Sequence, residues 1–221
     1  MATQVTDICI IGAGSGGLSL AAGASQMGAS VILIERGKMG GDCLNYGCVP
    51  SKALLAAGKI AHTFRHSQKF GITPQEPNID FKAVHDHVHD VMAQIEPNDS
   101  QSRFEKLGVT VIREEARFID RQTIQAGDTL IKAKYSVIAT GSSAFLPPLK
   151  GLAETPYLTN ETIFDLTHCP KHLLIIGGGP IGIEMAQAHR RLGAEVTVIT
   201  SHGILPKDDP ELVEVVKKQL L

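Results

Sequence analysis

The stretch ICIIGAGSGGLSLAAGASQMGASVILIE, residues 8–35, decides the fold of this chain. A short apolar run leads through a glycine-rich turn into an amphipathic segment, which ends with Gly-Ala before a second apolar run. That order is typical of a strand, a helix and a parallel strand. The same pattern returns without a gap at residues 173–200, LLIIGGGPIGIEMAQAHRRLGAEVTVIT. The chain therefore contains half of a dinucleotide-binding βαβ unit twice, which predicts an α/β fold with doubly wound, Rossmann-like sheets.

Each copy carries three glycines in the spacing G-x-G-x-x-G. The first makes the tight turn, the second lets the backbone approach a pyrophosphate, and the third lets the helix pack on the strand. The pyrophosphate would lie at the positive end of the helix dipole. One such string is weak evidence, but in this chain each string follows a strand and precedes a helix. The predicted pyrophosphate-binding residues are Gly12, Gly14 and Gly17 in the first copy, and Gly177, Gly179 and Gly182 in the second.

The residue that ends the second strand separates the copies. Glu35 ends it in the first copy, where a carboxylate can accept hydrogen bonds from ribose hydroxyls. The aligned residue in the second copy is Thr200, and no arginine follows immediately. The missing carboxylate removes repulsion against a 2′-phosphate, which slightly favours NADP over NAD at the second site. Two dinucleotide sites in one chain indicate two cofactors that exchange electrons.

Composition bounds the remaining possibilities. The chain has 221 residues, is 43% hydrophobic and 20% charged, and carries a net charge of −2. This balance gives no electrostatic case for nucleic acid. No apolar run approaches the roughly 18 residues of a membrane span. The opening MATQVTDICIIG lacks a basic-then-apolar signal segment, so we expect a cytoplasmic protein, in which a structural disulfide would be unusual.

The segment GGDCLNYGCVPSK, residues 40–52, holds two of the four cysteines, Cys43 and Cys48. A zinc site needs two more ligands, and neither Cys9 nor Cys169 belongs to a second paired motif. A structural disulfide and a redox pair are the other interpretations, and the compartment favours redox chemistry. If CVPSK starts a helix, the helix dipole would stabilise a thiolate at Cys48, and Lys52 would add positive charge one turn later.

Taken together, these motifs resemble class I flavoprotein disulfide reductases, in particular the dihydrolipoamide dehydrogenase and mercuric reductase branch. The resemblance rests on GGDCLNYGCVPSK, on the first glycine turn with Glu35, on IATGS at 138–142 and on GGGPIGIEMA at 177–186. It covers essentially the whole chain in the family's order. It implies an FAD-binding domain at 1–150, a linker at 151–170 and the beginning of an NAD(P)-binding domain at 171–221.

The resemblance also implies roles for single residues. Cys43 would be the interchange thiol that attacks substrate, and Cys48 the thiolate in contact with the flavin. Lys52 would lie near the reactive flavin nitrogen, paired with Glu184. The first glycine turn and Glu35 would hold FAD, and the second turn would hold the nicotinamide cofactor. Further FAD contacts are implied for Ala116, Thr140 and Gly141.

The implied enzyme passes electrons from NAD(P)H through FAD and a Cys43–Cys48 disulfide to a small-molecule disulfide or a metal ion. The family places further domains and a partner-supplied catalytic base beyond the region that these motifs span. We therefore expect an N-terminal fragment that is inactive alone, taken from a protein that forms a homodimer. The alternative is a non-catalytic FAD-binding redox module. A nicotinamide dehydrogenase without flavin would not explain the cysteine pair.

Four further features are open to test. Asp42 stands where many members of the family carry a threonine that touches FAD, so its carboxylate must avoid the pyrophosphate or share a cation. His85 and His89 lie one helical turn apart, and we interpret them as a solvated helix face rather than a metal site. Cys9 is predicted to be a small buried hydrophobe. The acidic KDDPEL, residues 207–212, predicts a helix start.

Overall fold

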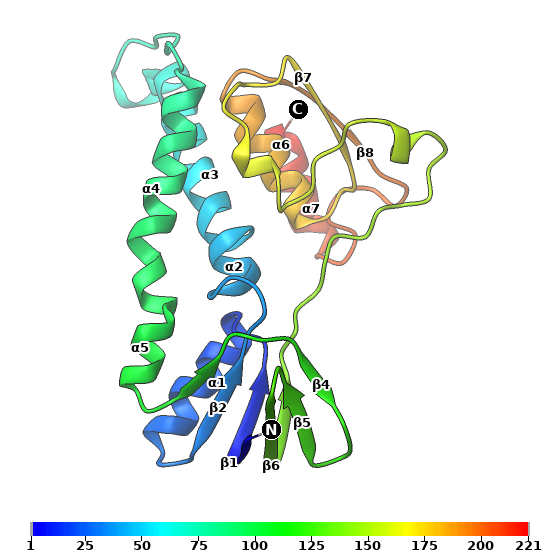
Figure 1. Cartoon of the computed structure of the whole chain (residues 1–221). Coiled ribbons are helices and arrows are strands. Elements are labelled where there is room, and N and C mark those ends of the chain that lie inside the picture. The colour runs from blue at the N-terminus through cyan, green and yellow to red at the C-terminus, as the bar shows by residue number, and fades with distance from the viewer. Residues whose placement is uncertain (1, 221) are drawn as a thin grey trace. The chain divides into compact units, whose positions relative to one another are not determined.

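The computed structural model describes residues 2–220. Helices and strands follow one another as the sequence predicts (Figure 1). In chain order they are β1 (Ala2–Ile11), α1 (Ser15–Gln26), β2 (Val31–Ile34), α2 (Gly41–Asn45), α3 (Cys48–Arg65), η1 (Ser67–Phe70), α4 (Phe81–Asp99), α5 (Gln101–Lys106), β3 (Thr110–Ile112), β4 (Ala116–Phe118), β5 (Thr123–Ala126), β6 (Thr129–Ile138), η2 (Leu152–Glu154), η3 (Ile163–Asp165), β7 (His172–Ile176), α6 (Pro180–Arg191), β8 (Glu195–Ile199) and α7 (Pro210–Leu220).

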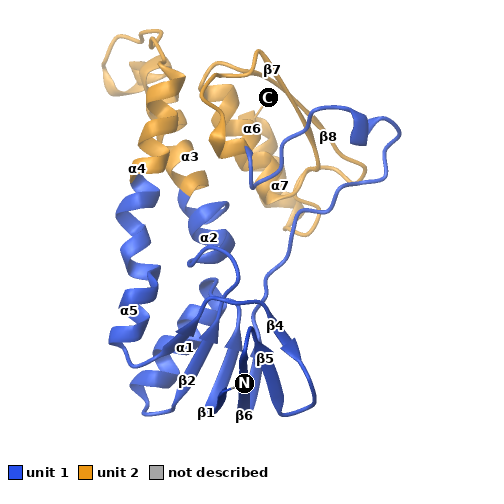
Figure 2. Ribbon diagram, in the orientation of Figure 1, with its two compact units in different colours: residues 1–49, 91–162 blue, residues 50–90, 163–221 orange. Residues whose placement is uncertain are grey.

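The chain divides into two compact units (Figure 2). Unit 1 comprises residues 1–49 and 91–162, and unit 2 comprises residues 50–90 and 163–221, so the division passes through α3 and α4. Packing thus assigns the helical residues 50–90 to the same unit as the second βαβ copy. Domain boundaries at 150 and 170 stay a prediction.

Unit 1 is built on one mixed sheet in the order β3-β2-β1-β6-β5-β4. Strands β3, β2, β1 and β6 are parallel to one another. Strand β5 runs antiparallel to β6, and β4 runs antiparallel to β5. The antiparallel pair β5–β6 is joined through the Gly127-Asp128 turn. The four parallel strands, with a βαβ unit at the centre of the sheet, confirm the α/β, Rossmann-like fold class.

Alternating apolar residues of the central strands supply both faces of this sheet. On one face Ile10 and Leu33 pack with α1 and with Phe104 of α5. On the other face Cys9 and Ile32 pack with side chains of β5 and β6. Cys9 is fully buried, as predicted, and burial raises the pKa of its thiol to about 11.

Unit 2 contains the parallel pair β7–β8, helices α6 and α7, most of α3 and the first half of α4. Helix α3 approaches α6 closely, because a Cβ built on Gly58 would lie only 3.3 Å from the carbonyl oxygen of Ala188. Arg65 also donates a hydrogen bond of 2.6 Å to the carbonyl of Arg191. The predicted C-terminal helix start is present, since the Asp209 carboxylate accepts from the Glu211 amide at 2.9 Å, next to the start of α7.

The repeat seen in the sequence is also a repeat of backbone geometry. The helix N-cap residues Gly14 and Gly179 are both extended, with φ and ψ of −83° and −174° in the first and −74° and 175° in the second. Both helices end at a glycine of positive φ, Gly28 and Gly193. The two βαβ copies are therefore built by the same local rules.

Within residues 2–220, no helix is both long and apolar enough to cross a membrane.

Candidate functional site

The first glycine turn is shaped by close backbone contacts. Gly12 has a φ of +107°, and a Cβ built on it would lie 2.2 Å from the carbonyl oxygen of Ala139. A Cβ on Gly17 would lie 1.9 Å from the carbonyl oxygen of Gly12. Gly14 caps α1 without a side chain, so nothing at the cap itself competes for the amides of the first turn. This backbone cradle at a helix N-terminus fits the pyrophosphate of a dinucleotide such as FAD.

Glu35 follows β2 directly, beside this turn. Its carboxylate accepts hydrogen bonds from the amides of Ala13, at 2.7 Å, and Gly37, at 2.6 Å. These two bonds fix the carboxylate next to the glycine turn, at the carboxyl end of a parallel strand. This is the position in which a carboxylate can accept bonds from a ribose.

The segment that follows β6 passes over the same turn. The Ala139 amide donates to Ile11 at 2.8 Å, and the Cα of Thr140 would lie 3.2 Å from a Cβ on Gly12. Gly141 has a φ of +70°, which lets the chain turn away after the carboxyl end of β6. The predicted FAD contacts Thr140 and Gly141 thus adjoin the glycine turn. Ala116 lies apart from it in sequence, at the start of β4, where it pairs with Ala126. A role for Ala116 in adenine binding stays a prediction.

The cysteine-bearing loop is docked on the glycine turn through backbone atoms. The Gly40 amide donates to the carbonyl of Ala13 at 2.9 Å, and Gly40 forms a parallel β-bridge with Gly14. A Cβ on Gly41 would lie 2.6 Å from the Cα of Gly14. Gly40 and Gly41 both have positive φ, so glycine is required at this point for conformation as well as for space. The docking holds the cysteine loop next to the predicted pyrophosphate site.

The two cysteines lie on successive helices. Cys43 belongs to α2, and α3 begins at Cys48, as the sequence predicts. In the described structure no disulfide joins them, and their side chains are hydrogen-bonded to each other. Burial, followed by the hydrogen bond with Cys48, raises the pKa of the Cys43 thiol to about 11. Both thiols are reduced in this structure, and a redox role for the pair stays a prediction. The capacity to form the disulfide stays a prediction.

The Lys52–Glu184 pairing that the resemblance implies is present in unit 2. Lys52 lies one turn into α3, and its ammonium forms an ion pair with the Glu184 carboxylate of α6. The two side chains are 61% and 34% exposed, so the pair is within reach of solvent. The pairing is confirmed, and its role beside a flavin stays a prediction.

The second glycine turn has the same form but different neighbours. Gly177 has a φ of +122°, and a Cβ on Gly182 would lie 2.3 Å from the Gly177 carbonyl oxygen. The loop after β8 folds back on this turn, where the Leu205 amide donates to the Gly178 carbonyl at 2.7 Å. At the position of Glu35, the Thr200 hydroxyl instead donates to the carbonyl of Gly203 at 2.8 Å. Gly177, Gly179 and Gly182 thus repeat the form of the first turn, and their role in nucleotide binding stays a prediction.

Asn160 is a contact that sequence reasoning missed. Its side-chain amide donates to the Asp42 carboxylate at 2.8 Å, and the other Asp42 oxygen would lie 3.0 Å from a Cβ on Gly47. One oxygen of the Asp42 carboxylate therefore accepts a hydrogen bond from Asn160. The substitution at Asp42 was visible in the sequence. Its partner lies more than a hundred residues away, and no local pattern indicates it.

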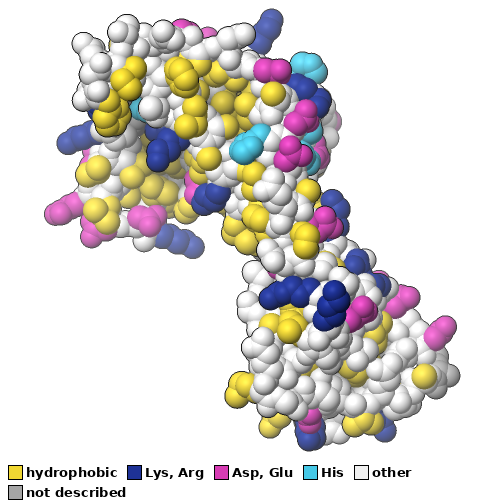
Figure 3. Space-filling model, turned by 90° about the vertical axis from the view of Figure 1, so that its left-hand side faces the viewer, with side chains coloured by type: hydrophobic (Ala, Val, Ile, Leu, Met, Phe, Trp, Pro, Cys, Tyr) yellow, Lys and Arg dark blue, Asp and Glu magenta, His cyan; other side chains and the backbone are white. Residues whose placement is uncertain are grey.

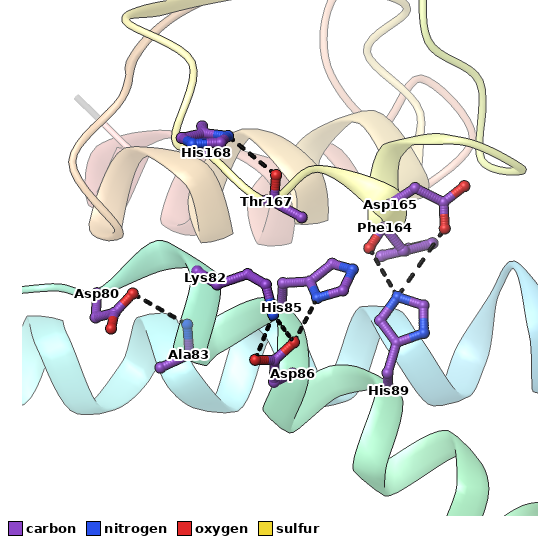
Figure 4. A network of polar contacts seen from close by, with 10 residues as sticks. All are labelled: Asp80, Lys82, Ala83, His85, Asp86, His89, Phe164, Asp165, Thr167 and His168. Atoms are coloured by element: carbon purple, nitrogen blue, oxygen red, sulfur yellow. Dashed lines mark hydrogen bonds and ion pairs between the residues drawn. The ribbon is translucent and has the colours of Figure 1, made fainter.

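The histidine pair on α4 is only in part the solvated face that we expected. The His85 side chain is only 17% exposed, and its Nδ1 lies 2.9 Å from the Asp86 carboxylate (Figure 4). His89 Nε2 lies 3.2 Å from the Phe164 carbonyl (Figure 4). The interpretation holds for His89, whose side chain is 38% exposed, and fails for His85, because the segment around η3 packs over this part of α4. Histidine and acidic side chains lie next to one another in the upper part of Figure 3. Still, residues 2–220 contain no group of three side chains placed to hold a metal.

Comparisons with known proteins agree with this geometry. The sequence model described as pyridine nucleotide-disulphide oxidoreductase matches residues 6–221. The mercuric reductase of Lysinibacillus sphaericus is 36% identical over 216 residues, which cover 97% of this chain and 40% of that protein. The mercuric reductase of Streptomyces lividans is 36% identical over 212 residues, covering 93% of this chain and 45% of that protein.

Among solved structures, the chain is similar to the Cu(II) complex of the HOCl-induced flavoprotein disulfide reductase RclA from Escherichia coli. The TM-score is 0.81 at 26% identity, and the match covers 97% of this chain and 46% of that one. The chain thus spans less than half the length of these relatives. On the family match and the identity to the two mercuric reductases, this chain belongs to the pyridine nucleotide-disulphide oxidoreductase family.

Proposed function

We propose that the protein to which this chain belongs is an FAD-dependent oxidoreductase that takes electrons from NAD(P)H and delivers them to a small disulfide or a metal ion. The observation that carries the proposal is the docking of the Cys43–Cys48 loop on the first glycine turn. A structural disulfide would not need to lie beside a dinucleotide cradle. The names of the relatives, mercuric reductase and flavoprotein disulfide reductase, support both classes of acceptor.

Different residues of the chain would bind different parts of the two cofactors. When bound, FAD would supply the two-electron exchange between a nicotinamide and the cysteine pair. The first glycine turn and Glu35 would hold its pyrophosphate and ribose, and Lys52 with Glu184 would lie at its reactive end. The second glycine turn would receive NAD(P)H. NADPH is favoured over NADH because Thr200 leaves no carboxylate to repel a 2′-phosphate.

With a disulfide substrate the cysteine steps balance as two exchanges. The Cys43 thiolate attacks one substrate sulfur, the substrate S–S bond breaks, and one thiolate leaves. Cys48 then attacks the Cys43 sulfur, releases the second thiolate and closes the Cys43–Cys48 disulfide. Two electrons have moved from the pair to the substrate. Because the pKa of Cys43 is about 11, its thiol is almost entirely protonated at neutral pH and needs a base.

That base would be supplied by the remainder of the complete protein, as would the dimer interface. We therefore propose that the 221-residue chain alone turns over no substrate, even with added FAD.

The test uses the complete protein and three single substitutions, Cys43→Ser, Cys48→Ser and Cys169→Ser. Cys169 is a matched control, since it is half-buried in unit 2 and its sulfur contacts the Leu192 carbonyl. We expect visible flavin absorption in every variant. NAD(P)H-dependent reduction of a disulfide should fall by roughly a hundredfold or more in the first two variants, because each lacks a sulfur of the exchange.

Turnover that survives both Cys43→Ser and Cys48→Ser would refute the proposal. Bound flavin without turnover in the unsubstituted protein would favour the non-catalytic redox module instead.

A further inference from the structure

The loop after β2 and the linker after β3 are neighbours in unit 1. The Glu35 amide donates to the carbonyl of Ile112 at 2.9 Å, which extends the pairing of β2 with β3 by one residue. Residues 35–37 and residues 113–115 therefore leave the sheet together, at the carboxyl ends of two parallel strands. The carboxylate predicted to bind the FAD ribose stands at the start of the first of these segments.

Gly37 holds the Glu35 carboxylate from one side. Its amide donates to Glu35 Oε1 at 2.6 Å, and a Cβ built on Gly37 would lie 3.3 Å from the same oxygen. The Ala13 amide donates to the other oxygen, Oε2, at 2.7 Å. Two backbone amides thus set the direction of a half-buried carboxylate, and one of them belongs to an exposed loop residue.

Two side chains of the linker contact this loop. The Arg113 guanidinium donates through Nη2 to the carbonyl of Gly37. Glu115 forms an ion pair of 3.5 Å with Arg36, and the two side chains of that pair are 58% and 74% exposed. Solvent therefore screens the ion pair, which contributes little to the position of the loop. Of the two contacts, that of Arg113 reaches the residue whose amide binds Glu35.

We propose that Arg113 is a positioning residue for the carboxylate that binds FAD. By binding the Gly37 carbonyl, it holds the Gly37 amide against Glu35 and so fixes the oxygens that accept the ribose hydroxyls. Without this donor, water would bind the carbonyl, and the loop and the carboxylate would be free to take other directions. The proposal rests on the proposed function in one respect, that Glu35 binds the ribose.

The test is the affinity of the complete protein for FAD, measured by titrating the apoprotein and following flavin fluorescence. Arg113→Met removes the donor and keeps the length of the side chain. We expect the Kd for FAD to rise roughly fivefold, because one hydrogen bond that orients the carboxylate is lost. Arg113→Lys keeps a donor for the single carbonyl and should bring the Kd back to within about twofold. Urea unfolding of the apoprotein should hardly change, since Arg113 is exposed.

Glu115→Gln is the matched control. It breaks the other contact between the linker and the loop, and it should change the Kd by less than about twofold. The double variant of Arg113→Met with Glu35→Gln then separates positioning from a general loosening of the loop. Because Arg113 acts through Glu35, Arg113→Met should cause little further loss of affinity once Glu35→Gln is present.

An unchanged Kd in Arg113→Met, or the same fivefold rise in the presence of Glu35→Gln, would overturn the proposal. An unchanged Kd in Glu35→Gln alone would do so too, because the carboxylate would then have no part in binding FAD. If the Kd values shift as expected but NAD(P)H-dependent turnover is absent, the proposed redox function fails and the positioning role stands.

Discussion

The two glycine turns share one sequence pattern and one backbone geometry, yet different segments pack on them. On the first turn, Ala139 and the Gly40–Gly41 loop approach from distant parts of the chain. On the second, Gly178 is approached by residues 203–205 of the loop that follows β8 directly. The glycine spacing therefore determines the backbone form of each turn. The segment that packs on the turn determines which side chains lie beside it. Only the first turn receives a pair of cysteines.

The largest expected effect is a difference in unfolding free energy between matched alanine substitutions in the two glycine turns. Gly12→Ala should lower the free energy of unfolding by about 3 kcal/mol or more, because its Cβ would collide with the Ala139 carbonyl at positive φ. Gly177→Ala has a similar φ, but nothing within the described residues lies within 4 Å of its Cβ. We expect it to lose only about 1–2 kcal/mol. Denaturant unfolding measures both.

Gly17→Ala and Gly182→Ala serve as the control for this comparison. Their Cβ atoms would lie 1.9 and 2.3 Å from the carbonyl oxygen of their own turn, so both should be strongly destabilising. Equal losses for Gly12→Ala and Gly177→Ala would mean that the returning segment does not stabilise the first turn.

The second prediction exchanges the residues that end the second strand of each copy. Thr200→Glu in the complete protein should move the ratio of kcat/KM for NADPH over NADH toward NADH by roughly tenfold, about 1.4 kcal/mol, through repulsion of the 2′-phosphate. Steady-state kinetics with both nucleotides measures the ratio. Glu35→Gln is the control, because it should weaken FAD retention and leave the nucleotide ratio unchanged. A shift toward NADPH in Thr200→Glu would contradict the assignment of the second turn.

The smallest effect concerns His189, which stands where the first copy has Ala24. His189 is fully buried, its Nδ1 lies 2.9 Å from the Met185 carbonyl, and its Nε2 has no partner among the described residues. Burial lowers the pKa of His189, so the unfolded chain binds the proton at a higher pH than the folded chain. Stability from this group is complete above about pH 6.5 and is lost as the pH falls below it.

His189→Leu should therefore flatten the fall of the unfolding free energy between about pH 6.5 and 5, by at most about 1.4 kcal/mol per pH unit. Urea unfolding at several pH values measures that slope. The same slope in His189→Leu as in the unsubstituted protein would assign the acid sensitivity to other groups.

Sequence alone predicts what depends on neighbours along the chain. The strands and helices of the two repeat copies and the start of α3 at Cys48 follow from local patterns, and the structure contains them. The Lys52–Glu184 contact followed only from family resemblance, since 132 residues separate the two. Packing of residues 50–90 with the second copy depends on a close approach at Gly58 that no periodicity reveals. Distant side-chain partners such as Asn160 require the folded chain.

The Gly14–Gly40 bridge has a consequence for how this sequence can vary. The first glycine turn and the cysteine loop are joined through main-chain atoms. Surrounding side chains can therefore be substituted without displacing the sulfurs. Any side chain at Gly41 would meet the Cα of Gly14 and push the two segments apart. A mutant library sorted only for bound flavin should therefore reject substitutions at Gly41. Selection for holding the cofactor would thus preserve the position of the cysteine loop as a by-product, even in a population under no demand for turnover.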